Sequence, residues 1–169
     1  MENIHDPHNV SAMLRTADAV GILGVNLLYT NQKFPRIGSK SSSSANKWIE
    51  RRKFSSATEC FVQLRKEGFQ ILATRLDDSA KDLYEFDLTK PTAFVFGNEH
   101  SGVSDDAAQH ADATLFIPMM GMIQSLNVSV ACAVTIYEAL RQRKQQGMYD
   151  GKRFSEEEFL RLYDEWLSK

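Results

Sequence analysis

The strongest constraint on the fold is a regular alternation of short apolar runs with segments of helical periodicity. The runs have the length of strands and are rich in branched and aromatic residues. They are Val25–Thr30, Gln70–Leu76, Pro91–Glu99 and Ala113–Met119. Strands that alternate with helices predict an α/β fold, with a mostly parallel sheet flanked by helices.

Two of the helical segments carry clear end signals. In the first, within Pro7–Gly24, Asn9 is the predicted N-cap and either Gly21 or Gly24 ends the helix. The second follows the first strand and ends at Gly68. Glycine ends helices readily because it adopts the left-handed conformation without a steric penalty.

A third helix, expected from about Leu126 to Gln145 and followed by Gly147, is apolar on nearly every side. Such a helix must be buried or lie at an interface, so the sequence predicts a homodimer. Ser125 and Asn127 stand at its start, where free backbone N–H groups can bind a ligand. The alternative is that Ser125 only caps the helix.

The composition fits a chain with one main domain and no membrane segment. The 169 residues suit a single core, and no run approaches the roughly 18 apolar residues of a membrane span. The spacing of Cys60 and Cys132 is not typical of a disulfide or of a metal site, and the N-terminus shows no signal-peptide pattern. We expect a cytoplasmic protein without metal, formed by a domain over 1–150 and a short acidic helical tail over 151–169.

The net charge of −2 conceals a basic stretch between Lys33 and Lys53, in which Glu50 is the only acid. Such a stretch is either a solvated face or a surface that binds RNA phosphates. We name Lys47, Arg51, Arg52 and Lys53 as the candidate RNA-binding residues. Part of this stretch, from Asn31 to Lys47, contains four consecutive serines and is predicted to be a mobile loop.

Two loops after predicted strands carry unusual residues. The loop GNEHSG, between Gly97 and Gly102, lacks the Lys-Ser pair of a phosphate-binding loop, and no dinucleotide fingerprint follows any strand. It does place Glu99 beside glycine, which permits close approach of a ligand. The methionines of PMMGMIQSLN would suit an adenine ring or a thioether; the alternative is that they fill the core.

Three stretches together resemble a known family. HNVSAMLRTADAVG, FVFGNEHSGVS and IPMMGMIQSLNVSVACAVTIYEALRQR resemble, in order and spacing, the motifs of the SpoU/TrmH family of RNA ribose 2′-O-methyltransferases in the SPOUT superfamily. The resemblance covers most of residues 3–149. It implies an α/β knot with a C-terminal deep trefoil knot, S-adenosyl-L-methionine as cofactor, a homodimer and an RNA substrate.

The resemblance also implies roles for individual residues. The catalytic set is Arg15, Asn9, Glu99 and Asn127. The cofactor-binding set is Thr74, Gly97, Glu99, Ile117, Met119, Ser125, Leu126 and Asn127. Arg141 and Arg143 would bind RNA phosphate or tether the active-site region. Because guanidinium stays protonated, we expect Arg15 to stabilise a developing alkoxide rather than to remove a proton.

Within the family, the first and third motifs look most like those of the members that methylate a guanosine of the tRNA D-loop, at position 18. The alternatives are an rRNA ribose 2′-O-methyltransferase and a non-catalytic RNA-binding pseudoenzyme. The chain departs from the family pattern at both ends. The basic N-terminal extension and most of the first strand are missing, and the tail is acidic and short.

Overall fold

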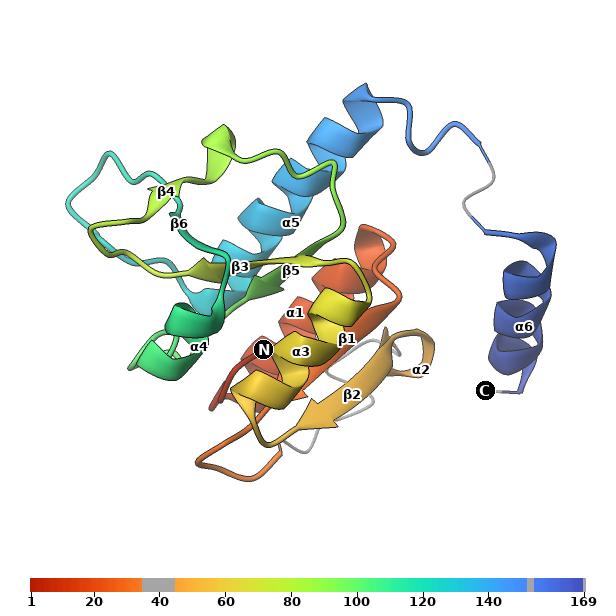
Figure 1. Cartoon of the computed structure of the whole chain (residues 1–169), viewed down its shortest axis with the longest axis horizontal. Helices are drawn as coiled ribbons and strands as arrows, with labels where there is room; N and C mark the ends of the chain where they lie inside the picture. The colour runs from red at the N-terminus through yellow and green to blue at the C-terminus, as the bar shows by residue number, and fades with distance from the viewer. Residues whose placement is uncertain (35–44, 152–153, 169) are drawn as a thin grey trace.

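The computed structural model describes residues 1–34, 45–151 and 154–168 (Figure 1). The helices are α1 (Pro7–Ala19), α2 (Ala45–Trp48), α3 (Ala57–Lys66), α4 (Asp105–His110), α5 (Val128–Gln145) and α6 (Glu156–Leu167), with a 3₁₀ turn η1 (Leu83–Glu85). The strands are β1 (Gly24–Leu28), β2 (Glu50–Phe54), β3 (Gln70–Thr74), β4 (Lys81–Asp82), β5 (Thr92–Val95) and β6 (Ala113–Phe116). Most of the predicted mobile loop, with Arg36 and Lys40, lies outside the described residues.

All strand pairs are parallel, which confirms the predicted α/β class. The strands form two sheets rather than one, in the orders β1-β2 and β4-β6-β3-β5. Residues 1–3 join them: the backbone N–H of Glu2 donates to the Phe96 carbonyl at 2.8 Å, and that of Asn3 donates to Leu28 at 2.9 Å. Among the described residues, backbone hydrogen bonds therefore link the two sheets only through residues 1–3, while side chains such as those of Leu28 and Val95 pack together in one core cluster.

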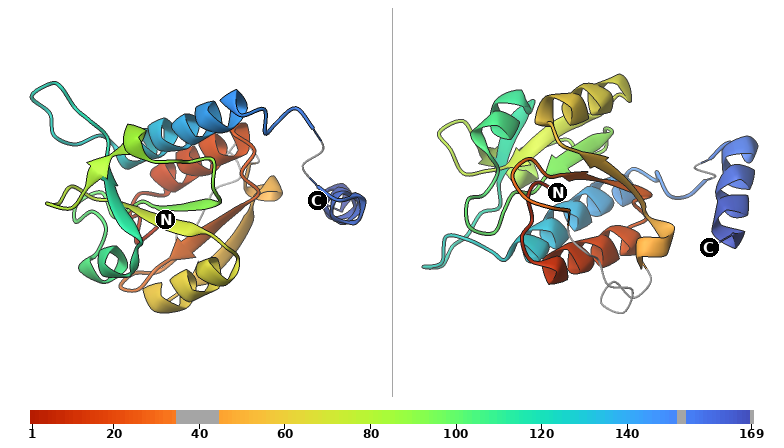
Figure 2. Two further views of the ribbon diagram at one scale, coloured as in Figure 1. Left: turned by 45° about the horizontal axis from the view of Figure 1, so that its top comes forward. Right: turned by 90° about the horizontal axis from the view of Figure 1, so that it is seen from below.

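Helices cover both sides of the strands (Figure 2). On one side α1 and α5 lie against each other, and Met13 and Ile136 pack in their shared core. On the other side Phe61 and Leu64 of α3 pack against Ile71 of β3. Burial of one large apolar side chain contributes roughly 1.5–3 kcal/mol, so these layers hold the strands in place. Among the described residues, no helix is long and apolar enough to cross a membrane.

The first helix begins earlier than predicted. Asp6, not Asn9, is its N-cap, because Pro7 can occupy the first helical position and the Asp6 side chain accepts a hydrogen bond from the His8 backbone N–H at 2.8 Å. Asn9 therefore lies inside the first turn, with its side chain available for other contacts. The helix ends at Ala19 with Val20 as its C-cap, and Gly21, one of the two predicted stops, follows with φ of 76°.

The long helix α5 begins at Val128, two residues later than predicted. Its cap is Asn127, whose Oδ1 accepts hydrogen bonds from the Ser129 backbone N–H at 2.8 Å and the Ser129 hydroxyl at 2.6 Å. Ser125 lies exposed in the preceding loop, so the interpretation of Ser125 as the cap is wrong.

The basic stretch contains a strand that the sequence pattern did not reveal. The strand β2 alternates exposed Arg51 and Lys53 with the partly buried Arg52, whose guanidinium pairs with Glu67 of α3. β2 pairs with β1 alone and forms the edge of its sheet. Charged side chains are common on edge strands, where they discourage pairing with other chains.

The backbone crosses itself closely just after β5. A Cβ atom added to Gly97 would lie 2.1 Å from the Gly102 carbonyl carbon and from the Val103 nitrogen. Asn98 and Gly102 form a β-bridge that closes this loop. Gly97 is thus required by the protein's own backbone, which approaches it more closely than any side chain would allow.

We predict that Gly97→Ala destabilises the fold by about 3 kcal/mol or more, since the atoms in the way are backbone and cannot rotate aside. This corresponds to a fall in Tm of roughly 6–12 °C for a chain of this size. Thermal unfolding followed by circular dichroism measures it. The control is Gly121→Ala, because a Cβ at Gly121 meets no atom within 4 Å. Equal Tm values for the two variants would contradict the close approach of the Gly102–Val103 backbone to Gly97.

Candidate active site

The carboxyl ends of three parallel strands meet at one edge and bring predicted cofactor residues together. Thr74, the last residue of β3, lies opposite Leu115 of β6, and its hydroxyl donates to the Val95 carbonyl of β5 at 2.9 Å. Gly97 and Ile117 each follow two residues beyond these partners. Ligands of parallel α/β proteins bind beyond the carboxyl ends of the strands, which is where these three residues lie.

Glu99, in the loop after β5, is held by three donors. Its Oε2 accepts the His5 backbone N–H at 2.8 Å, and its Oε1 accepts the Asp6 backbone N–H at 3.0 Å and the Asn9 Nδ2 at 2.9 Å. Burial alone would raise the pKa of Glu99, but these hydrogen bonds outweigh it and lower the pKa below the usual glutamate value. The carboxylate is therefore fixed and ionised.

Asn9 connects Glu99 to the start of α5. Its Nδ2 faces Glu99, and its Oδ1 accepts a hydrogen bond from the Asn127 Nδ2 at 3.1 Å. The Oδ1 of Asn127 is already used to cap α5, so each amide can satisfy these contacts in one orientation only. We call Glu99, Asn9 and Asn127 the Glu99 cluster. It joins three of the four predicted catalytic residues, from segments far apart in the sequence.

Arg15, the fourth, lies outside this cluster. It is on the exposed face of α1, nearly two turns beyond Asn9, or about 9 Å along the helix axis. Arg15 makes no hydrogen bond or ion pair with any residue that the structure describes. Its guanidinium is thus free to contact a bound molecule.

The loop from Pro118 to Asn127 stands away from the core (Figure 2). Met120 and Met122 are 94% and 100% exposed, and Met119 and Leu126 are also exposed. The alternative that these methionines fill the core of the chain is therefore wrong. The loop instead presents soft apolar side chains to solvent beside the Glu99 cluster.

The predicted RNA-binding residues divide into exposed and engaged side chains. Lys47, Arg51 and Lys53 are exposed, and the Lys53 Nζ lies 5.1 Å from the centroid of the Phe34 ring. Arg52 faces inward: its Nη2 bonds Glu67 at 3.0 Å and its Nε bonds the Asn26 Oδ1 at 3.0 Å.

Arg141 and Arg143 are both engaged within the fold. Arg141 donates to both carboxylate oxygens of the buried Glu138 at 2.7 Å, and these bonds lower the pKa of Glu138. Arg143 donates to the carbonyls of Leu88 at 2.9 Å and Lys90 at 2.8 Å. The contacts of Arg143 tie α5 to the segment that leads into β5, whereas those of Arg141 stay within α5.

Two hydrogen-bond donors of the site could not be predicted from the types of residues in the sequence. They are the backbone N–H groups of His5 and Asp6, which donate to Glu99. Backbone donors leave no signal in side-chain chemistry. The only available signal was the position of both residues just before α1, where the chain must turn.

Comparison with known proteins matches this geometry to one family. The model of the SpoU rRNA methylase family matches residues 1–137. The tRNA (guanosine(18)-2′-O)-methyltransferase of Thermus thermophilus is 44% identical over 169 residues, which cover 100% of this chain and 87% of that protein. The crystal structure of the Aquifex aeolicus TrmH/SpoU tRNA modifying enzyme superposes with a TM-score of 0.91 at 40% identity, covering 98% of this chain and 84% of that one.

A further solved relative contains the cofactor. The SpoU methyltransferase AviRb from Streptomyces viridochromogenes, in complex with AdoMet, has a TM-score of 0.73 and 29% identity, over 84% of this chain and 56% of that one. The family model covers most of the chain, and the first relative matches all of it. This chain therefore belongs to the SpoU methylase family.

Proposed function

We propose that this protein transfers the methyl group of S-adenosyl-L-methionine to the ribose 2′-hydroxyl of guanosine 18 in the D-loop of tRNA. The observation that carries this proposal is the Glu99 cluster, which fixes three polar residues at the strand edge. Support for the tRNA substrate comes from the relatives in Thermus and Aquifex, which are named as tRNA enzymes.

The residues at the strand edge fit the cofactor. Thr74, Gly97 and Ile117 would contact it at the strand ends, and the exposed apolar side chains of Met119 and Leu126 suit its adenine ring and the methylene groups beside its sulfur. Ser125 and Asn127 would supply polar contacts to it. When bound, the cofactor supplies an electrophilic methyl group on a sulfonium sulfur.

The protein residues prepare the ribose for attack. The 2′-hydroxyl must lose its proton as it attacks, and the charge of Arg15 stabilises the alkoxide that develops. Glu99 already accepts three hydrogen bonds, so it is a positioning residue that orients Asn9 and, through it, Asn127. RNA phosphate or water takes the proton.

The exposed cations form the RNA surface. Lys47, Arg51 and Lys53 project from α2 and β2, and exposed Phe34 beside Lys53 adds an aromatic ring on which a base can stack. Arg52 is excluded from this surface because Glu67 holds it. The RNA surface proposed here therefore comprises three of the four cations named from the sequence in this segment.

A homodimer would cover the apolar surface that a single chain exposes. Val130 and Tyr137 on α5 are 47% and 49% exposed, and Met120, Met122 and Ile123 of the loop before α5 are exposed as well. Monomeric proteins rarely leave so many large apolar side chains uncovered in one region. The cofactor loop would then lie at the dimer interface.

Three features complete the proposal. The segment from Ile117 through α5 is the threaded part of a deep trefoil knot, as the family resemblance implies. Residues 1–150 form the methyltransferase domain and 151–169 the tail, of which α6 has no buried residue. The protein acts in the cytoplasm, where tRNA is modified.

We predict that Arg15→Ala lowers the single-turnover rate of tRNA methylation about 10² to 10³-fold, equivalent to ~3–4 kcal/mol of barrier. Affinity for the cofactor should stay nearly unchanged, since Arg15 contacts charge that appears only during reaction. Asn127→Ala should lower both the single-turnover rate and the affinity for the cofactor. Calorimetry gives the affinities. Asp18→Ala, also exposed on α1, is the control. A near wild-type rate for Arg15→Ala would exclude this role.

The RNA surface is tested by salt dependence. Replacing Arg51 and Lys53 together by Gln should weaken tRNA binding and reduce the slope of log K against log salt by about 0.7–0.9 for each phosphate that the variant no longer binds. Arg52→Gln is the matched control from the same strand. It should lower stability while the slope stays constant. An unchanged slope in the double variant would mean that Arg51 and Lys53 form a solvated face and do not bind RNA phosphates.

The dimer is tested by sedimentation. Tyr137→Glu should dissociate the dimer or unfold it, because an uncompensated charge buried in an interface costs several kcal/mol, roughly 3–5. Val62→Glu is the control, since Val62 is 46% exposed but lies on α3, in the opposite layer of helices. A wild-type chain that sediments as a monomer at micromolar concentration would contradict the dimer.

A further inference from the structure

Asn3 has a backbone conformation that residues with a side chain rarely adopt. Its φ is 48°, and no other non-glycine residue that the structure describes has a positive φ. Asparagine tolerates this left-handed region better than most residues, because its short polar side chain can form hydrogen bonds nearby. Such conformations persist only where the surroundings hold them, and they cluster at functional sites. Asn3 lies two residues before His5, which donates to Glu99, so its conformation bears on the candidate site.

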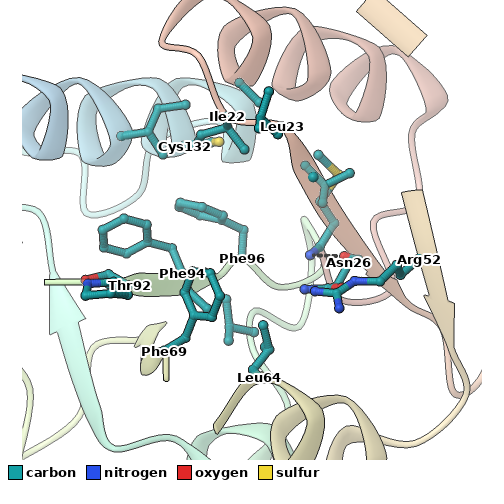
Figure 3. A pocket seen from close by; sticks show the side chains of 18 of the residues that line it. Ile22, Leu23, Asn26, Arg52, Leu64, Phe69, Thr92, Phe94, Phe96 and Cys132 are labelled. Atoms are coloured by element: carbon teal, nitrogen blue, oxygen red, sulfur yellow. Dashed lines mark hydrogen bonds between the residues drawn. The ribbon is translucent and has the colours of Figure 1, made fainter. Parts of the chain in front are cut away.

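The left-handed residue ends a strand-like segment. Residues 1–3 lie between β1 and β5, at one end of a mostly apolar cavity of about 730 Å³ that Met1 and Glu2 help to line (Figure 3). The Asn3 N–H donates to the Leu28 carbonyl of β1 at 2.9 Å. A residue in the left-handed region cannot continue an extended strand. The chain therefore leaves β1 at Asn3 and turns toward the start of α1.

Side-chain contacts hold this turn in place. The Oδ1 of Asn3 accepts the Thr30 backbone N–H at 3.0 Å, and its Nδ2 donates to the Thr30 hydroxyl at 3.1 Å. The side chain of Gln32 donates to the Asn3 carbonyl, and the next carbonyl, that of Ile4, accepts the buried Tyr29 hydroxyl at 2.9 Å. Asn3 is only 6% exposed, so water cannot readily replace these contacts. The turn is thus fastened to the end of β1.

The backbone on both sides of the turn holds the loop that carries Glu99. The carbonyl of Asn3 accepts the Nδ2 of Asn98 at 2.7 Å, and Asn98 directly precedes Glu99. Two and three residues after Asn3, the N–H groups of His5 and Asp6 donate to the Glu99 carboxylate. One carbonyl and two N–H groups from a single short segment therefore hold two adjacent residues of the loop.

We propose that Asn3 is a positioning residue of the active site: its left-handed turn aims these three backbone groups at Asn98 and Glu99, and thereby sets where Glu99 holds Asn9. Asn3 acts through Glu99 and not on the reacting atoms. Its effect on methyl transfer rests on the proposed function, whereas its effect on Glu99 does not depend on the substrate. A purely structural residue would only fasten the turn to Thr30.

The test compares two substitutions at this position. Asn3→Gly and Asn3→Val both lose the contacts with Thr30, so both should lower Tm. Glycine adopts the left-handed conformation without a steric penalty, but β-branched valine does not. In Asn3→Val the single-turnover rate of tRNA methylation should fall roughly tenfold or more, because a small misplacement of an active-site group costs up to about 10²-fold. Asn3→Gly should stay within about threefold of the wild-type rate.

The pKa of Glu99, followed by carbon NMR of its carboxyl group, is the second measurement. Burial raises this pKa, but the hydrogen bonds from Asn9, His5 and Asp6 outweigh it. Their loss in Asn3→Val should therefore raise the pKa, and Asn3→Gly should leave it unchanged. The control is Thr30→Val, which removes the hydroxyl that accepts the Asn3 Nδ2. It should lower Tm without moving the pKa of Glu99.

Equal rates and an equal Glu99 pKa in the glycine and valine variants would overturn the proposal, because the left-handed turn would then have no effect on the site. If Asn3→Val does not fold, Asn3→Ala replaces it, since alanine also disfavours the left-handed region but is smaller. A wild-type chain that methylates no tRNA would instead contradict the proposed function, and the comparison of Glu99 pKa values would still test Asn3.

Discussion

The hydrogen bond between Glu99 and Asn9 is the contact on which the site depends. It joins the loop after β5 to the first turn of α1, and Asn9 passes the constraint to Asn127 at the start of α5. A half-buried carboxylate with three donors holds its position because moving it would leave its charge uncompensated. The cluster therefore fixes how α1, α5 and the strand edge lie relative to one another.

Much of the fold follows from the sequence because its signals are local. Four strands, three helices and their terminating glycines arise from periodicity and from backbone preferences within a few residues. The pattern does not reveal β2 for a physical reason. At a sheet edge, charged side chains can stay in water while the backbone pairs with the neighbouring strand, so the alternation of apolar and polar residues that predicts a strand is absent. The caps were misplaced because Asp6 and Asn127 compete with nearby polar residues that are equally suitable by type.

The candidate site was less accessible from residue patterns alone. The roles of Asn9, Glu99 and Asn127 came from the family motifs, since contacts between residues 9, 99 and 127 leave no local trace. Composition could not separate Arg52, which holds Glu67, from its exposed neighbours Arg51 and Lys53. The separation of the two sheets depends on backbone pairing, which has no counterpart in side-chain composition.

In a single chain the thioethers of Met119, Met120 and Met122, in the loop before α5, are open to oxidants, and the dimer proposed above would shield them. Exposed methionine is readily converted to the sulfoxide, which is polar and chiral. The conversion would remove the soft apolar surface of the loop and leave the core unaltered, because these side chains lie outside it. Methionine sulfoxide reductases reverse this change, so oxidation would alter the surface of this loop reversibly and leave the packed core in place.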